Sequence, residues 1–415
     1  MRSSLSVPAS ASAVSVGHSF DPRQRGRVRV GVVIAGFCTF LPVYATQPLL
    51  PELQRFFSAS PITTSMTVSA VTIAIAMASP LVGSLADSIG RKRVIVSAIL
   101  GLAVPTCMAA TSSTLNQLIA WRFAQGLFIP GIIAVTLAYI AEEMPTGTAA
   151  SITAAYVTGT VLGGMCGRFL TAMVASYRGW PAAFVFLGVM TAVCGLLTWL
   201  CLPRSQRFVR QPDLSAPLRA MLIHLGNRRL LATYFVGFNS LFALVGVFTY
   251  VNFYLAGEPF HLGLIALGSV FLVYGLGLIV TPLAGPLIDR FGCRAAQTGA
   301  AGIVIAGASL TLIPLVWCVV AGLAVLSSGI FVAQSAASTH VGVAAREARS
   351  SAAGLYVSFY YLGGSAGATI LGWLWKGDGW MACVACVVIM QSISAMVVLR
   401  FFSSKTYCPA KQELV

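Results

Sequence analysis

Residues 83–94 read GSLADSIGRKRV, and residues 285–296 carry a related stretch, GPLIDRFGCRAA. Both fit the pattern G-x-L-x-D-x-x-G-x-[KR], and each lies between two long apolar runs. Two further pairs recur at nearly the same spacing. YVTGTVLGGMCG from Tyr156 matches YVSFYYLGGSAG from Tyr356, and a Gly-Trp pair at 179–180 matches one at 379–380. Three matches about 200 residues apart predict a chain built from two copies of one unit.

The composition indicates a protein that lies mostly in lipid. The 415 residues are 57% hydrophobic and only 9% charged, whereas soluble domains carry roughly 25% charged residues. Twelve apolar runs approach or exceed the roughly 20 residues that cross a bilayer as a helix, and none alternates as a barrel strand does. We therefore predict an all-α membrane protein with two six-helix repeats. The runs cover residues 28–50, 64–86, 94–113, 116–140, 148–173, 179–202, 230–254, 264–287, 295–314, 316–339, 350–373 and 379–402.

The positive charges predict the orientation of these spans. The formal net charge is +15, and twelve spans would place both termini on one side. That side holds 21 of the 26 Lys and Arg residues, whereas the other side holds only Arg55, Arg178 and Lys376. The excess is typical of the cytoplasmic side. We expect cytoplasmic termini in a bacterial inner membrane, and we expect no nucleic-acid partner.

The predicted organisation has five parts. Residues 1–27 are Ser-rich and predict a disordered cytoplasmic tail. Residues 28–202 and 230–402 predict the two six-helix bundles. The basic stretch 203–229 predicts a cytoplasmic linker between them, and residues 403–415 predict a cytoplasmic tail.

The two charged loops resemble a motif of the major facilitator superfamily. The first loop matches at Gly83, Asp87, Gly90 and Arg91, and its weaker copy matches at Gly285, Asp289 and Gly292. WRFAQG at 121–126 fits the superfamily's Arg-x-x-Gln-Gly pattern. YATQPLLPEL at 44–53 and LGGMCGR at 162–168 resemble the acriflavine-sensitivity, YnfM-like branch of bacterial efflux proteins. The resemblance covers about residues 28–402 and implies transport by alternating access.

The resemblance implies a role for these loops as a conformational gate. In the superfamily, the loop Asp meets the cytoplasmic start of helix 11, which lies near Ser350 and Ser351 here. A carboxylate at a helix N-terminus is favourable by about 0.3–1 kcal/mol. Such a contact forms only while the cytoplasmic side is closed, so Asp87 is expected to act as a latch, and Asp289 is its symmetric counterpart.

The fifth span resembles the superfamily's antiporter motif with two departures. It matches at Gly159, Gly163 and Gly167, but has Gly164 in place of a proline and Arg168 in place of the last glycine. Small residues allow membrane helices to approach closely. We therefore expect these glycines and their counterparts Gly363, Gly364 and Gly367 to pack helices together.

Two cations lie within the spans, and both are candidates for a substrate site. Arg122 is either a substrate ligand or a structural pin to carbonyl groups. Arg168 either lines the cavity or extends toward the membrane surface. No acidic residue lies mid-span, and this pattern suits anionic or neutral solutes better than cations. In the superfamily, spans 1, 4, 7 and 10 line the cavity. The candidate substrate-binding residues are Arg122, Gln125, Gln47, Tyr44, Asn239, Gln334 and Arg168.

The leading functional hypothesis is proton-coupled efflux of small organic compounds or drugs. The alternative is transport of organic anions or sugars, by uptake or exchange. The titrating group would be Glu142, Glu143 or Asp87, because the membrane interior offers no carboxylate. No metalloprotease or nucleotide-binding motif is present, so we expect no enzymatic activity, no cofactor and no metal. The expected partners are a small-molecule substrate, protons and membrane lipid, and the expected state is a monomer.

Overall fold

The structure is a computed structural model that describes residues 22–203, 221–345 and 348–402. The side chains of residues 22, 23, 81, 83–89, 146, 147, 349 and 350 also lie outside its described part. The described chain contains helices and turns and no strand. The all-α prediction is therefore confirmed.

The helices fall into two sequential sets. The first set comprises α1 (Pro22–Val43), α2 (Leu50–Phe56), α3 (Pro61–Ile89), α4 (Arg91–Ala109), α5 (Leu115–Glu143) and α6 (Thr146–Cys201). The second set comprises α8 (Arg228–Ala256), α9 (Leu264–Val270), the 3₁₀ helix η1 (Phe271–Leu276), α10 (Gly277–Leu310), α11 (Val316–Ala344) and α12 (Arg349–Phe401).

Glycines reverse the chain where the sequence predicts loops. Nine apolar segments of the described chain are long enough to cross a membrane, and three of them have 47 to 54 residues, about twice the length of one span. Each of these three contains a break with non-helical dihedral angles, at Gly179 (φ 79°), Gly292 (φ 80°) and Gly379 (φ 63°). Gly90 (φ 104°) separates α3 from α4. Glycine adopts positive φ without a steric penalty, and dividing the three segments at their breaks is consistent with twelve spans.

Several helix ends differ from the predicted boundaries. Helix α1 begins at Pro22 rather than at residue 28, and it ends at Val43, after which residues 44–49 form turns. Helix α8 begins at Arg228, inside the predicted linker. The predicted tail over residues 1–21, the middle of the linker (204–220) and the tail over 403–415 lie outside the described residues.

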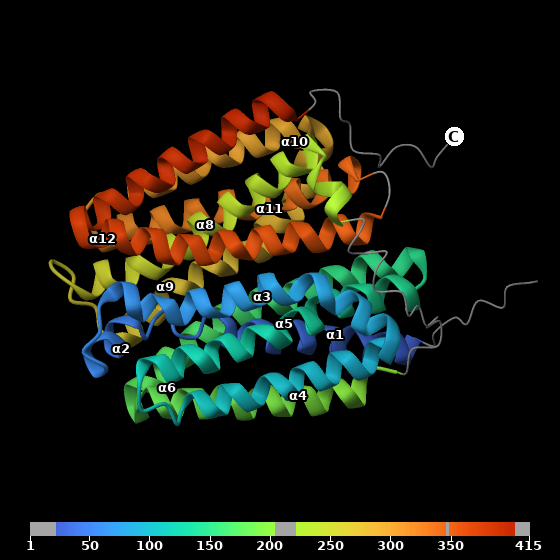
Figure 1. Ribbon diagram of the computed structural model, residues 1–415, viewed down its shortest axis with the longest axis horizontal. Coiled ribbons are helices and arrows are strands. Elements are labelled where there is room, and N and C mark those ends of the chain that lie inside the picture. The colour runs from blue at the N-terminus through green and yellow to red at the C-terminus, as the bar shows by residue number, and fades with distance from the viewer. Residues whose placement is uncertain (1–21, 204–220, 346–347, 403–415) are drawn as a thin grey trace, which may run out of the picture.

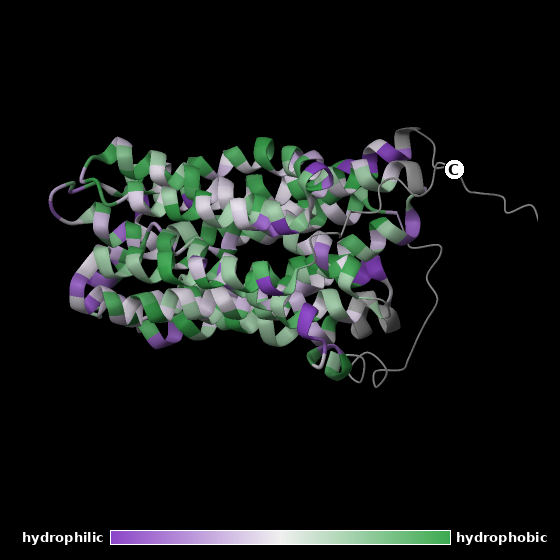
Figure 2. Cartoon of the chain, turned by 90° about the horizontal axis from the view of Figure 1, so that it is seen from above, coloured by the Kyte–Doolittle hydropathy of each residue, from purple (hydrophilic) through white to green (hydrophobic). Residues whose placement is uncertain are grey.

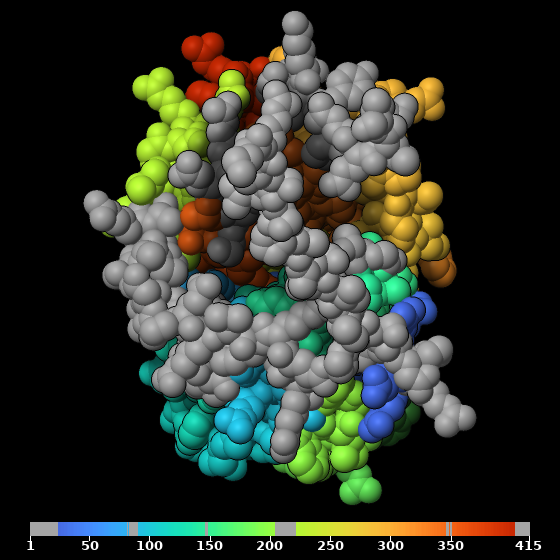
Figure 3. All heavy atoms as spheres, turned by 90° about the vertical axis from the view of Figure 1, so that its right-hand side faces the viewer, coloured from blue at the N-terminus to red at the C-terminus, as the bar shows by residue number. Residues whose placement is uncertain are grey.

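The two sets form two layers with their helices side by side (Figure 1). One layer contains α1 and α3–α6, and the other contains α8 and α10–α12. Strongly hydrophilic residues gather mainly at the two ends of the molecule (Figure 2). We call the end with the Gly90 and Gly292 turns the basic end, and the end with the Gly179 and Gly379 turns the far end. Figure 3 views the basic end, with the two halves above and below one another.

Backbone contact at glycines builds a tight helix pair in each half. A methyl group at Gly163 would overlap the carbonyl oxygen of Phe37 in α1, and Gly159 and Gly167 meet α1 carbonyls in the same way. In the other half, Gly363 meets the Phe238 carbonyl of α8, and Gly367 meets another α8 carbonyl. The predicted packing glycines thus hold α1 on α6 and α8 on α12. Gly364 also packs against α8 side chains, whereas a methyl group at Gly164 would lie 3.4 Å from Arg168 Nη1.

Hydrogen bonds between the two halves gather toward the far end. Ser65 Oγ in α3 donates to the carbonyl of Ala368 in α12 at 3.1 Å. Tyr250 Oη in α8 lies 2.9 Å from Ser65 Oγ and 2.8 Å from the same carbonyl. One α3 turn further along, Ser69 Oγ lies 3.1 Å from Thr369 Oγ1. The bonds of Ser65 and Ser69 join the halves toward their far ends, and the Tyr250–Ala368 bond supports them within the second half; we call this group of bonds the far-end seam.

Candidate functional site

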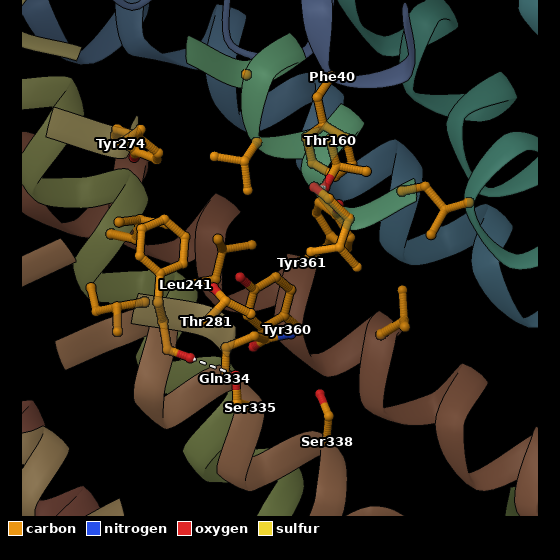
Figure 4. Close-up of a pocket in the computed structure, with 18 of the residues that line it drawn as sticks. Phe40, Thr160, Leu241, Tyr274, Thr281, Gln334, Ser335, Ser338, Tyr360 and Tyr361 are labelled. Atoms are coloured by element: carbon orange, nitrogen blue, oxygen red, sulfur yellow. Dashed lines mark hydrogen bonds between the residues drawn. The ribbon is translucent and has the colours of Figure 1, made fainter. Parts of the chain in front are cut away.

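A cavity of about 530 Å³ lies between the two halves. It reaches from Arg168 in α6 to Val341, close to the end of α11, and Ala353, close to the start of α12. It therefore extends toward the basic end, while the far-end seam joins the halves beyond its other end. Figure 4 shows tyrosine side chains and the polar residues of α11 around this space.

Arg168 is the one cation among the described residues that line the cavity. Its side chain is 2% exposed. The guanidinium Nε donates to Gln47 Oε1 at 2.7 Å, and Nη1 donates to the Gly164 carbonyl at 2.6 Å. A guanidinium has five N–H donors, so three of them have no acceptor among the described residues. This arginine can still bind an anion.

Aromatic rings from both halves surround the same guanidinium. Its central carbon lies 4.6 Å from the ring centroid of Tyr44, 4.9 Å from that of Phe271 and 4.5 Å from that of Tyr274. Cation–π contacts at these distances stabilise a buried charge. Because Tyr44 belongs to the first half and the other two rings belong to η1, Arg168 lies at the boundary between the halves.

Arg122, by contrast, is fully buried and is not among the residues that line the cavity. Its Nε donates to the Thr67 carbonyl at 3.1 Å and its Nη1 to the Pro42 carbonyl at 2.7 Å, and further bonds reach the Val43 carbonyl and Gln125 Oε1. The carbonyls of Pro42 and Val43 lie at the end of α1, where the regular helical bonds stop; the Pro42 carbonyl also accepts from the Ala45 N–H at 3.2 Å. Arg122 thus caps α1, as the structural alternative from the sequence predicts.

The other candidate residues divide between the cavity and its surroundings. Tyr44 and Gln334 line the cavity, and Gln334 Oε1 accepts a hydrogen bond from Tyr356 Oη at 2.9 Å. Gln47 lies behind Arg168, and Gln125 lies beside Arg122. Asn239 is 1% exposed, and its amide donates to a carbonyl of its own helix.

Tyrosines from both halves line the cavity, and Tyr44 is the one among them that is also a substrate-binding candidate from the sequence. Six tyrosines line the cavity: Tyr44, Tyr156, Tyr274, Tyr356, Tyr360 and Tyr361. Tyr156 and Tyr356 begin the matched stretches of the repeat, so their equivalent positions carried a signal that both face the same central space. The rings of Tyr356 and Tyr360 stack with centroids 6.1 Å apart. The cavity wall is therefore aromatic with hydroxyl groups.

The gate and proton-coupling candidates lie at the basic end. Arg91 forms a bidentate pair with Glu142, with Nε at 3.1 Å and Nη2 at 2.6 Å from the two carboxylate oxygens. Glu143 is 3% exposed, whereas Asp289 is exposed. Gly83 lies within α3, and a methyl group at Gly285 would meet no atom within 4 Å. The Asp87 side chain lies outside the described residues, and the latch stays a prediction.

The comparison with known proteins decides the family. Residues 32–368 match the profile of the Major Facilitator Superfamily. The chain belongs to the Major Facilitator Superfamily. The resemblance seen in the charged loops is thereby confirmed, and the protein is a multi-pass membrane protein of a transporter family rather than a member of an enzyme family.

Similar proteins agree over most of the chain. The "Uncharacterized MFS-type transporter YybF" of Bacillus subtilis (strain 168) is 30% identical over 361 residues, which is 87% of this chain and 89% of that protein. The "Inner membrane transport protein YnfM" of Escherichia coli (strain K12) is 30% identical over 377 residues, 90% of each chain. A solved bacterial homolog to the human lysosomal transporter Spinster, inward-facing and unoccupied, shares the fold with a TM-score of 0.74 at 13% identity. That match covers 93% of this chain and 98% of the other.

Proposed function

We propose that this protein is a secondary active transporter for small organic anions with an aromatic or apolar body. The observation that carries the proposal is Arg168, a buried cavity arginine with three N–H groups that have no acceptor among the described residues. A carboxylate accepts two parallel hydrogen bonds from a guanidinium, and such charge-assisted bonds are roughly twice as strong as neutral ones. The surrounding tyrosines suit an aromatic body.

The charge of the cavity argues against a cationic substrate. The described lining residues include Arg168 and no Asp, Glu or His. A second positive charge about 5 Å from Arg168 would cost about 3 kcal/mol at an effective dielectric constant of about 20. Of the two hypotheses from the sequence, transport of organic anions is therefore favoured over efflux of small organic compounds or drugs where these carry a positive charge.

The arrangement of the two halves supports alternating access as the mechanism. The cavity extends toward the basic end, and the far-end seam closes the opposite side. Transporters with two six-helix repeats expose a central site to either side as one half rocks against the other. Breaking the seam and closing the basic end would expose Arg168 to the far side. The positive-inside rule places the basic end in the cytoplasm, and we propose the bacterial inner membrane as the location.

We retain protons as the coupling ion and Glu142 as the first candidate for the titrating group. Glu142 is paired with Arg91 beside the Gly90 turn. Protonation of Glu142 would remove a negative partner of Arg91, and the turn at Gly90 would carry this change to the gate. Glu143 and Asp87 are the further candidates, and export is the proposed direction.

Transport into everted membrane vesicles tests the proposal. Uptake of labelled 4-hydroxybenzoate and of a cationic dye is measured with and without an imposed proton gradient. We expect gradient-driven uptake of the carboxylate alone, and its loss in Arg168→Gln. Arg178→Gln, which removes an exposed far-end cation, should transport normally. Uptake of the dye that survives Arg168→Gln would refute the anion proposal and restore drug efflux.

A further inference from the structure

We infer that Gln47 is a positioning residue that links the occupancy of Arg168 to the closure of the far end. The inference rests on the proposed function, because it requires that the transported anion binds Arg168. Gln47 is fully buried in the turns between α1 and α2. It touches the cavity arginine with one end of its amide and the opposite half of the protein with the other.

The two ends of the amide have different partners. Gln47 Oε1 accepts from Arg168 Nε at 2.7 Å, and Gln47 Nε2 donates to Thr249 Oγ1 at 3.3 Å. Arg168 and Gln47 belong to the first half, whereas Thr249 belongs to α8 in the second half. Thr249 is fully buried. A single side chain therefore connects the proposed anion site to the interface that must open.

The surroundings place this link at the closed boundary between the halves. In η1, Phe271 and Tyr274 lie against the Arg168 guanidinium. A methyl group at Gly268 of α9 would overlap the side chain of Ala172, one turn beyond Arg168 in α6. Tyr250, which joins the far-end seam, follows Thr249 directly in the chain. Opening of the far end must separate these surfaces and break the Gln47–Thr249 bond.

An anion and Gln47 compete for the same donor. A carboxylate that binds side-on to a guanidinium uses Nε and one Nη, and Nε is the group that Gln47 Oε1 occupies in the structure. A carboxylate is a stronger acceptor for a guanidinium than a neutral amide is. A carboxylate that binds side-on therefore displaces Gln47, and the displaced amide no longer holds its Nε2 against Thr249. End-on binding to the N–H groups that have no acceptor would leave Gln47 in place, so the inference requires the side-on mode. The empty site favours a closed far end, and the occupied site releases it.

Distance measurements across the far end test this link. Spin labels are placed at Arg178→Cys and Lys376→Cys, one exposed position on each half, in a protein whose native cysteines are replaced. The protein is reconstituted in lipid nanodiscs, and distances are measured with and without 4-hydroxybenzoate. Thr249→Val removes the hydroxyl acceptor, and Thr249→Ser keeps it as the matched control. A hydrogen bond of ordinary strength predicts a shift of about two- to tenfold toward the long distance in ligand-free Thr249→Val.

The outcomes separate the link from the proposed function. We expect 4-hydroxybenzoate to populate the long distance in the wild type and to add little in Thr249→Val, whose binding affinity should stay within the wild-type range. Gln47→Met should resemble Thr249→Val, and Thr249→Ser should resemble the wild type. Unchanged distances in Thr249→Val, with Arg168-dependent binding of 4-hydroxybenzoate intact, would overturn the link alone. Absence of binding to the wild type would overturn the proposed function and the link with it.

Discussion

Ser65→Ala should open the far end of the transporter. Ser65 Oγ donates to the Ala368 carbonyl at 3.1 Å and lies 2.9 Å from Tyr250 Oη, so the change removes two hydrogen bonds between the halves. Each bond contributes about 0.5–1.5 kcal/mol. The Ser65 hydroxyl has one proton, which is shared between the Ala368 carbonyl and the Ile62 carbonyl of its own helix, 2.8 Å away. The two lost bonds therefore contribute about 1–2 kcal/mol together, in the lower part of the range that two full bonds would give.

This free energy should be visible as a change of population. About 1–2 kcal/mol corresponds to about a 5- to 30-fold shift from the far-end-closed toward the far-end-open state. Tyr250 keeps its own bond to the Ala368 carbonyl at 2.8 Å, so no buried hydroxyl loses its last partner. The spin-label distance between positions 178 and 376 reports the two populations in the absence of ligand.

A matched variant separates the seam from a general effect of losing a serine. Ser97 Oγ donates only to the Val94 carbonyl of its own helix among the described residues, so Ser97→Ala should keep the wild-type distances. The reasoning would be refuted by wild-type distances in Ser65→Ala, or by an equal shift in Ser97→Ala.

Three further predictions concern packing, capping and pH. Gly163→Ala should lower the thermal midpoint by an amount equivalent to about 1–3 kcal/mol, because a methyl group would overlap the Phe37 carbonyl. A methyl group at Gly302 would enter open space, so Gly302→Ala should keep the wild-type thermal midpoint. Arg122→Met should destabilise the protein by about 3 kcal/mol or more, since the buried Val43 carbonyl loses the Arg122 donor and the Pro42 carbonyl keeps only the Ala45 N–H. A stable variant that has lost only transport would contradict this. Burial raises the pKa of Glu52 above its ordinary value, and Arg55 partly opposes this. A carboxyl group whose pKa is higher in the folded than in the unfolded state stabilises the folded state at low pH. That contribution to the free energy of unfolding is lost as the pH rises through the folded-state pKa. Thermal melts should therefore show Glu52→Gln gaining stability over the wild type near pH 7 and not near pH 4.

Much of the fold could be predicted from composition and repetition. Apolar runs must lie in lipid, and the glycines at 90, 179, 292 and 379 recur in matched pairs between these runs. The structure has a chain reversal with positive φ at each of them. The exact end of α1 could not be predicted, since the apolar run continues through residues 44–50. Hydropathy does not distinguish a buried turn from a helix, and this boundary determines where Tyr44 and Gln47 lie.

The roles of the two buried arginines depend on that same boundary. Besides the Gln125 side chain, Arg122 is held by backbone carbonyls at the end of α1 and in α3, and no residue pattern reveals such atoms. Arg168 replaces a glycine of the family motif, and this departure is the sequence signal for the cavity cation. Which arginine stays available to a ligand follows from three-dimensional contacts.

The repeat places Ala368 at the position that Arg168 holds in the first half. The carbonyl of Ala368 accepts the seam bonds, while its methyl side chain carries no charge. An anion held by Arg168 is therefore attached to only one of the two halves. As the halves rock, this cargo stays still relative to the N-terminal half, and the C-terminal half moves its aromatic wall around it. The N-terminal half then holds the substrate, and the C-terminal half opens and closes access to it, although the two halves share one architecture.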